Sequence, residues 1–358
     1  MREKRKKNKW LRLGMLFGLL SLLGVAGFIA WPYFELYQAN NESGLNLNEG
    51  ETAEVFIKTG WETEDVAEYL STSGLLKDKA SFLKVAEAKN FQGNNIVPGK
   101  YELQVGWSNG QVIDHLRVGN GRLEVDVTFH NTHTLEEVSE AITAHLELDH
   151  EEFHAYITSD SIQEKYGFNE HTMISFFIPE TYRMDWAISR DDLMARLAKE
   201  YKGFWTPERK EKAAAIRLSQ SKVATLATIV MGEQSKKPDE WPAIAGLYLN
   251  RLKKDMKLQS DPTVKYALGD WTIRRVLNKH LEVDSPYNTY KNKGLPPGPI
   301  FLATKDAMDA VLNYKQHDYI YMCAKPEYSG YHNFAVTYNE HLRNAKAYRR
   351  WLDAEGIR

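Results

Sequence analysis

An uncharged, mostly apolar run from Leu13 to Phe34 is the strongest constraint on what this chain can fold into. A helix needs about twenty such residues to cross a bilayer, so the run is long enough to form one transmembrane helix. The twelve residues before it include seven Lys or Arg. Because basic flanks remain in the cytoplasm, we expect a cytoplasmic tail over residues 1–12, a single-pass helix over residues 13–34 in the cytoplasmic (inner) membrane, and everything after Glu35 outside the cytoplasm.

A cleaved signal peptide is the alternative for this N-terminal segment. Its apolar region would be shorter than the run observed here, and Trp31-Pro32-Tyr33 is a poor small-residue cleavage site. The aromatic Trp31, Tyr33 and Phe34 also stand where the side chains of an interfacial belt belong. The sequence therefore favours a retained anchor.

The composition narrows the class of protein. A chain of 358 residues suits an anchor plus two or three compact units. The net charge of −2, from 46 basic and 48 acidic residues, provides no electrostatic footprint for nucleic acid, so we expect no nucleic-acid partner. Cys323 is the only cysteine, so no intrachain disulfide can form.

The pattern after the anchor predicts a linker and then a small α+β module. Residues 35–50 are rich in Asn, Ser, Gly and Glu, which is typical of a flexible spacer. Residues 51–120 then predict a strand, two helices and a return strand, at residues 54–58, 63–70, 79–88 and 99–103, followed by a helix at residues 110–118.

Residues 121–358 predict a larger mixed α+β domain. Thr134-Leu135-Glu136-Glu137 matches a capping box, in which Thr134 and Glu137 each satisfy a free backbone donor at a helix start. Further helices are predicted at residues 191–199, 206–218 and 221–234, and the segment Phe176–Tyr182 is expected to pack beneath the last of them.

Glu233 is the candidate catalytic residue. Val223, Leu226 and Val230 follow one another at helical spacing, and Glu233 takes the next position of the same face. A carboxyl group on an apolar face is partly desolvated, which raises its pKa toward the range of a general acid.

The segment after Glu233 supplies candidate binding residues. A helix ending near Lys253 is expected to carry Asn250 and Arg251 toward Glu233. Asp261-Pro262 predicts a helix start, so Asp261 is either an N-cap or a substrate contact. Gln259 lies in the preceding loop, where its amide could bind a sugar hydroxyl or an N-acetyl group.

Two further loops are suited to an uncharged glycan. Tyr287-Asn288-Thr289-Tyr290 offers an amide and two phenols beside aromatic faces, which orient a neutral ligand by hydrogen bonding, although a surface turn would show the same pattern. The stretch from Gly294 to Pro299, which contains Pro297, restricts the backbone and predicts a rigid wall.

Taken together, Glu233, the Leu258–Val264 segment, the Tyr287–Tyr290 turn and the Gly294–Gly298 loop resemble the active-site signature of the endolytic murein transglycosylases, the YceG-like family. The resemblance implies a transmembrane helix, a LysM-like module over residues 51–120 and a mixed α+β catalytic domain over residues 121–358. It also implies substrate-binding residues, namely Gln259, Asp261, Tyr287, Asn288, Thr289, Tyr290 and Pro297, and supporting residues, namely Asn250, His332 and Phe334.

The implied reaction needs a single carboxylate. A glycosidase that uses water normally needs two, whereas Glu233 has no partner in its immediate sequence. We therefore expect Glu233 to act as acid and then as base, leaving a 1,6-anhydro end on N-acetylmuramic acid. The alternatives are a hydrolase in which Asp261 or Glu240 activates water, and a non-catalytic glycan-binding scaffold. The family commonly has a second glutamate at the position of Met231. The scaffold is favoured if this replacement means that the site has lost its activity.

No metal or cofactor is expected. The pairs His130 and His133, and His150 and His154, have spacings that can ligate zinc, but neither comes with an obvious third ligand. By resemblance, the partners are nascent peptidoglycan strands, peptidoglycan synthases and the elongation or division machinery. The enzyme would end glycan polymerisation close to the bilayer.

Overall fold

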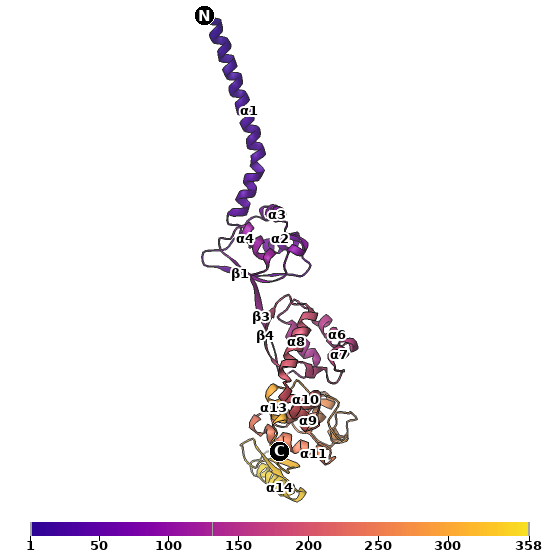
Figure 1. Cartoon of the computed structure of the whole chain (residues 1–358). Coiled ribbons are helices and arrows are strands. Elements are labelled where there is room, and N and C mark those ends of the chain that lie inside the picture. Colours follow the sequence, from indigo (N-terminus) through magenta and orange to yellow (C-terminus); the bar gives the residue numbers. More distant parts are fainter. Residues whose placement is uncertain (1, 131, 357–358) are drawn as a thin grey trace. The chain divides into compact units, whose positions relative to one another are not determined.

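The computed structural model describes residues 2–130 and 132–356, and in residues 2–12 only the backbone. Helices dominate and strands are few, which confirms the predicted α+β class (Figure 1). The chain divides into two compact units, residues 1–125 with 184–187, and residues 126–183 with 188–358. We call them unit 1 and unit 2.

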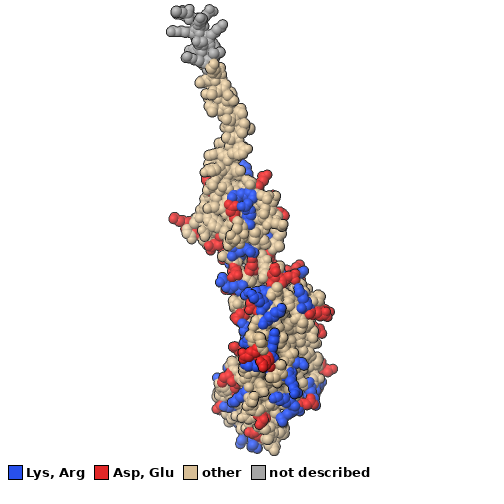
Figure 2. Space-filling view, in the orientation of Figure 1, with Lys and Arg blue, Asp and Glu red and all other residues tan. Residues whose placement is uncertain are grey.

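The apolar run forms the greater part of helix α1 (Arg2–Asn41). The portion Leu13–Asn41 is long and apolar enough to cross a membrane, with a mean hydropathy of 2.2 in its most apolar window and none of that window buried. On the face shown in Figure 2, the described part of this helix carries few charged side chains, whereas Lys and Arg alternate with Asp and Glu over the rest of the chain.

The predicted spacer is more ordered than expected. Helix α1 continues to Asn41, and isolated bridges then join Ser43 to Ser108 and Leu45 to Leu76. Leu45 is buried in the core of unit 1, and Leu36 and Ala39 pack against that core. These bridges and apolar side chains, Leu47 among them, draw the segment onto the module, so the prediction of a flexible spacer over residues 35–50 is wrong for most of its length.

Unit 1 has the predicted order of strand, helix, helix and strand. Strand β1 (Thr52–Ile57) pairs antiparallel with β2 (Gly99–Gln104), and α2 (Thr63–Thr72), α3 (Lys79–Ala88) and α4 (Asn109–Val118) pack with them. A short 3-10 helix, η1 (Gly93–Asn95), precedes β2. The LysM-like character of this module remains a prediction.

Strands β3 (Arg122–Phe129) and β4 (Glu180–Asp185) continue the sheet in the order β1-β2-β3-β4. The first part of unit 2 consists of α5 (Leu135–Thr143), α6 (His150–Thr158), α7 (Asp160–Tyr166), η2 (Met173–Phe176), α8 (Arg190–Phe204) and α9 (Pro207–Ala215). The capping box predicted for α5 is half confirmed, because the Thr134 hydroxyl accepts from Glu137 N, whereas the Glu137 carboxylate accepts from His133 N.

Helix α10 (Gln220–Glu233) is the centre of unit 2. All eight residues from Val223 to Val230 are buried, so the helix is covered on every side and not along one stripe as predicted. It packs against α11 (Trp241–Lys253), α12 (Asp261–Leu268), α13 (Lys305–Leu312) and η2. Ile178 shares a core cluster with residues of α10, so this part of the Phe176–Tyr182 segment packs with that helix as predicted. The remaining elements are η3 (Pro238–Glu240), η4 (Asn278–Glu282), the hairpin β5 (Tyr321–Ala324) and β6 (His332–Ala335), and α14 (Tyr338–Ala354).

Candidate active site

Glu233 is the last residue of α10, and its side chain turns into a cluster of hydroxyl groups. The Tyr248 hydroxyl donates to Glu233 Oε1 at 2.7 Å, and the Ser260 hydroxyl donates to the same oxygen at 2.5 Å. No residue that the structure describes donates a hydrogen bond to the other oxygen, Oε2. One carboxylate oxygen is therefore held by the protein while the other is left for a proton and a ligand.

The two hydroxyl donors were missed by the sequence analysis. Tyr248 lies on α11, buried to 2% exposure, and Ser260 is completely buried at the start of α12. Asp261 is the first residue of α12, so the prediction that it is the N-cap is wrong. Ser260 holds the cap position, but its hydroxyl makes no cap hydrogen bond because it is committed to Glu233.

Burial raises the pKa of Glu233 above its ordinary value and is the largest influence on it. The hydrogen bonds from Ser260 and Tyr248 oppose that rise because they favour the ionised form. The charge of Asp261 adds to the rise in pKa, and the charge of His332 opposes it. The net direction is upward, which suits a group that must hold a proton before it donates one.

Gly232 allows the end of α10 to approach α12. A Cβ atom at this position would lie 2.7 Å from Pro262 Cβ and 2.8 Å from Pro262 Cγ, closer than real contacts permit. This approach brings Glu233 to Ser260. A larger side chain at position 232 would push the two helices apart, so the glycine is required for the site to close.

The Tyr287–Tyr290 turn is mainly a structural support. Asn288 is fully buried, donates to the carbonyls of Leu281 and Val283, both at 2.8 Å, and accepts from Tyr290 N. Its amide is therefore committed to holding the turn. Thr289 is also buried, and its hydroxyl accepts from Ser260 N at 3.0 Å. The turn thus fixes the backbone of the serine that holds Glu233.

The remaining predicted binding residues lie around this support. The Tyr290 hydroxyl donates to Asp261 Oδ1 at 2.6 Å, and the buried Tyr287 ring lies 4.5 Å from the ring of Tyr266. Gln259 is exposed with a φ of 52°, and Pro297 is exposed in its loop. Gln259, Tyr290, Asp261 and Pro297 are therefore the predicted residues with surface available to a ligand.

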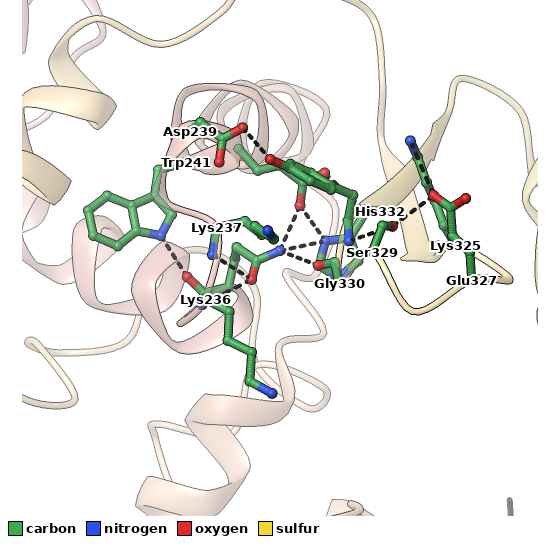
Figure 3. A network of polar contacts seen from close by, with 12 residues as sticks. Lys236, Lys237, Asp239, Trp241, Lys325, Glu327, Ser329, Gly330 and His332 are labelled. Atoms are coloured by element: carbon green, nitrogen blue, oxygen red, sulfur yellow. Dashed lines mark hydrogen bonds and ion pairs between the residues drawn. The ribbon is translucent and has the colours of Figure 1, made fainter.

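A second polar network adjoins the end of α10. The buried Glu240 accepts from His332 N at 2.9 Å, from Gln234 Nε2 at 2.7 Å, and contacts His332 Nδ1 at 2.8 Å. Gln234 also donates to the Gly330 carbonyl and accepts from the backbone of Lys236 and Lys237. Figure 3 shows how this network joins the loop after α10 to the β5–β6 hairpin. It holds His332 near Glu233.

Asn250 and Phe334 support the hairpin from the other side. Asn250 Nδ2 donates to the carbonyls of His317 and Tyr319, so the amide is directed at that segment and not at Glu233. Phe334 stacks on Tyr319 with ring centroids 5.5 Å apart. The neighbouring Arg251 donates to the carbonyls of Ile320 and Leu258. These contacts hold the strands and the Leu258 loop together.

Met231 lies in an apolar setting beside this site. It packs against the core of unit 2, and its sulfur accepts a contact from the Thr304 hydroxyl at 3.6 Å. His150 and His154 both contact the carboxylate of Glu136, at 3.4 and 2.9 Å. Within residues 2–130 and 132–356, no group of three or more His, Cys, Asp or Glu side chains is arranged to hold a metal ion.

Comparison with known proteins agrees with the signature found in the sequence. The chain is 29% identical to the endolytic murein transglycosylase of Bacillus subtilis over 348 residues, 91% of each protein. It is 24% identical to the endolytic murein transglycosylase of Streptococcus pneumoniae serotype 2, over 91% of this chain and 63% of that longer protein. A crystal structure of a yceG-like protein from Listeria monocytogenes superimposes with a TM-score of 0.52 and 27% identity, covering 82% of this chain and 98% of that one. The model of the YceG-like family matches residues 55–347, and the chain therefore belongs to that family.

Proposed function

We propose that this protein is a membrane-anchored endolytic lytic transglycosylase that cuts within nascent peptidoglycan strands. The observation that carries the proposal is the asymmetric setting of Glu233, with two hydroxyl donors on Oε1 and no described donor on Oε2. Its relatives from Bacillus subtilis and Streptococcus pneumoniae, both named endolytic murein transglycosylases, support the substrate class.

In the first step, protonated Glu233 gives its proton to the oxygen that links N-acetylmuramic acid to N-acetylglucosamine. The bond from the muramoyl C1 to that oxygen breaks through an oxocarbenium-like state. Burial raises the pKa of Glu233, which favours the acid form that this step consumes. As negative charge develops on the carboxylate, the hydrogen bonds from Tyr248 and Ser260 strengthen and stabilise it.

In the second step, the Glu233 carboxylate removes the proton from the muramoyl C6 hydroxyl. The C6 oxygen forms a new bond to C1, which gives the 1,6-anhydro end, and Glu233 regains the proton that it lost. The reaction consumes no water, so one carboxylate is sufficient. Gln259, Tyr290 and Pro297 have exposed surface with which to contact the strand.

The anchor would restrict where the enzyme cuts. Helix α1 has the length and hydropathy of a single-pass span. Because basic flanks remain in the cytoplasm, we propose that the tail of residues 1–12 lies on that side. A tethered site reaches only glycan close to the membrane, where strands are polymerised. We therefore propose that the enzyme ends polymerisation and sets strand length, working beside peptidoglycan synthases and the elongation or division machinery.

Hydrolysis is the second candidate, and one observation favours it. Asp261 lies close enough to Glu233 for its charge to raise the pKa of that residue. Two neighbouring carboxyl groups are what a water-using glycosidase employs. Glu240, the other residue considered for this role, is buried and already bonded to His332 and Gln234.

Mass spectrometry of glycan digested by the purified protein in H2(18)O separates the two reactions. Lytic cleavage gives 1,6-anhydromuramoyl ends without the heavy isotope, whereas hydrolysis gives reducing ends that carry it. Anhydro ends support the proposal. Labelled reducing ends alone would overturn it in favour of Asp261-assisted hydrolysis.

A further inference from the structure

A pocket of about 440 Å³ opens in unit 2 directly beside the end of α10. Met231, Gly232 and Ser235 line one side of it, and Pro262 of α12 lines another. Gly232 adjoins Glu233 in the chain and Pro262 adjoins Asp261, so the pocket borders the segments that hold Glu233, although Glu233 itself does not line it. The volume is within the range of pockets that hold small ligands.

Three rings from distant segments form the wall of this pocket. The His133 ring lies 4.8 Å from Trp271 and 5.8 Å from Phe301, and Trp271 lies 5.7 Å from Phe301. Trp271 and Phe301 are both only partly buried. Aromatic surfaces of this kind offer a large apolar contact with a polar edge, which suits the ring of a sugar.

Lys265 is the one Lys, Arg, Asp or Glu side chain among the residues that line the pocket. It is partly buried on α12, and no carboxylate of the described residues forms an ion pair with it. An ammonium group beside apolar rings favours a ligand that brings its own negative charge. A neutral sugar alone would leave the Lys265 ammonium group without a negative partner.

We infer that this pocket binds the sugar adjoining the scissile bond together with the peptide that hangs from it. The rings take the sugar, and Lys265 pairs with a carboxylate of the stem peptide. The inference rests on the proposed function, since in peptide-bearing peptidoglycan the lactyl carboxyl of the muramoyl sugar is bound in the amide to the peptide, and the free carboxylates lie on the peptide. It makes the enzyme selective for strands that still carry their peptides.

The test compares two substrates, peptide-bearing strands and the same strands stripped of peptide by an amidase and then amidated at the lactyl carboxylate that the amidase frees. For Lys265→Gln, we expect KM on peptide-bearing strands to rise about fivefold, the scale of one partly exposed ion pair. KM on stripped strands and kcat on both should not change. For Trp271→Ala, KM should rise on both substrates. Equal effects of Lys265→Gln on the two substrates, or none on either, would overturn the inference.

The matched controls are Lys210→Gln and Tyr328→Ala. Lys210 is an exposed lysine on α9 and Tyr328 is 74% exposed in the β5–β6 loop, and neither lines the pocket. Both variants should leave KM unchanged; a rise as large as that in the pocket variants would show that any surface lysine or aromatic acts in the same way, and would overturn the assignment.

Binding measured without cleavage separates this inference from the proposed function. In Glu233→Gln, tryptophan fluorescence is titrated with the two kinds of strand, with and without Lys265→Gln. Tighter binding of peptide-bearing strands that depends on Lys265 supports the pocket even if the wild-type protein proves unable to cut glycan. An affinity that is the same for both kinds of strand and unchanged by Lys265→Gln refutes the pocket assignment even if cleavage is observed.

Discussion

The Ser260 hydroxyl donates its hydrogen bond to Glu233 Oε1 although Ser260 occupies the N-cap position of α12. A serine at such a position normally satisfies a free backbone N–H of the first turn. Here the helix start is left without a side-chain cap, and the hydroxyl serves a carboxylate at the end of another helix. The start of α12 is therefore less stable than it would be with a side-chain cap, and the hydroxyl instead holds the Glu233 carboxylate in place.

Ser260→Ala should therefore slow cleavage more than it destabilises the fold. Loss of a hydrogen bond to a developing carboxylate lowers kcat by about tenfold. Because the Ser260 hydrogen bond lowers the pKa of Glu233, its removal raises that pKa further. The acid form then persists to higher pH, so the alkaline limb of the kcat profile should move upward. An unchanged rate and limb would exclude a catalytic role for this hydrogen bond.

Ser219→Ala is the matched control. Ser219 caps α10, and its hydroxyl accepts from Lys222 N at 3.3 Å. Its loss should lower the free energy of unfolding by about 1 kcal/mol while leaving the pH profile in place. Denaturant titration and rate measurements on the same preparations distinguish the two serines.

Tyr248→Phe should act on the same oxygen as Ser260→Ala. The phenyl ring keeps the packing of α11, and only the donor at 2.7 Å from Glu233 Oε1 is removed. We expect kcat to fall by about tenfold and the alkaline limb to move in the same direction. The double variant should show a rate that differs from the product of the two single effects, since both donors serve one atom. Independent effects would contradict this shared role.

Glu240→Gln should destabilise the protein because Glu240 accepts from His332 and Gln234 inside the fold. A glutamine would turn an amide toward groups that are themselves donors, which costs about 1–3 kcal/mol in the free energy of unfolding. Asp239→Asn is the control, since Asp239 is exposed and, among the residues that the structure describes, accepts a hydrogen bond only from Tyr331. Its change should be within about 0.5 kcal/mol. Equal stability of the two variants would refute the importance of the buried network.

Glu233→Gln should be more stable than the wild type at alkaline pH. The pKa of Glu233 is raised in the folded protein, so the folded state holds its proton to higher pH than the unfolded chain. The wild type therefore loses stability as pH rises from the unfolded carboxyl value of about 4.3 through the raised folded value. Melting temperatures at pH 4 and pH 8 test this. A variant less stable than the wild type at pH 8 would contradict it.

Local patterns predicted much of the framework. The Thr63 and Lys79 helices, the helix around Leu226 and its terminal Glu233 follow from helical spacing and N-caps. The hydroxyl partners do not, because Tyr248 and Ser260 lie 15 and 27 residues from Glu233 and reach it only through the packing of three helices.

The errors have the same origin. Asp261 has the sequence context of an N-cap, but the adjacent Ser260 holds that position. A sequence pattern cannot place a helix boundary to within one residue. Asn288 was expected to face substrate, but its side chain is buried and donates to the carbonyls of Leu281 and Val283. These contacts depend on the conformation of the preceding loop, which the residue types alone do not predict.

The most direct test of the account is the rate at which Glu233→Gln cuts peptidoglycan strands, measured beside its melting temperature and its affinity for uncut glycan. The account predicts a loss of about 10³-fold in kcat, with the fold and glycan binding preserved, because the amide keeps the shape of the side chain but can neither give nor take the proton. A variant that cuts within tenfold of the wild-type rate would remove Glu233 from the mechanism.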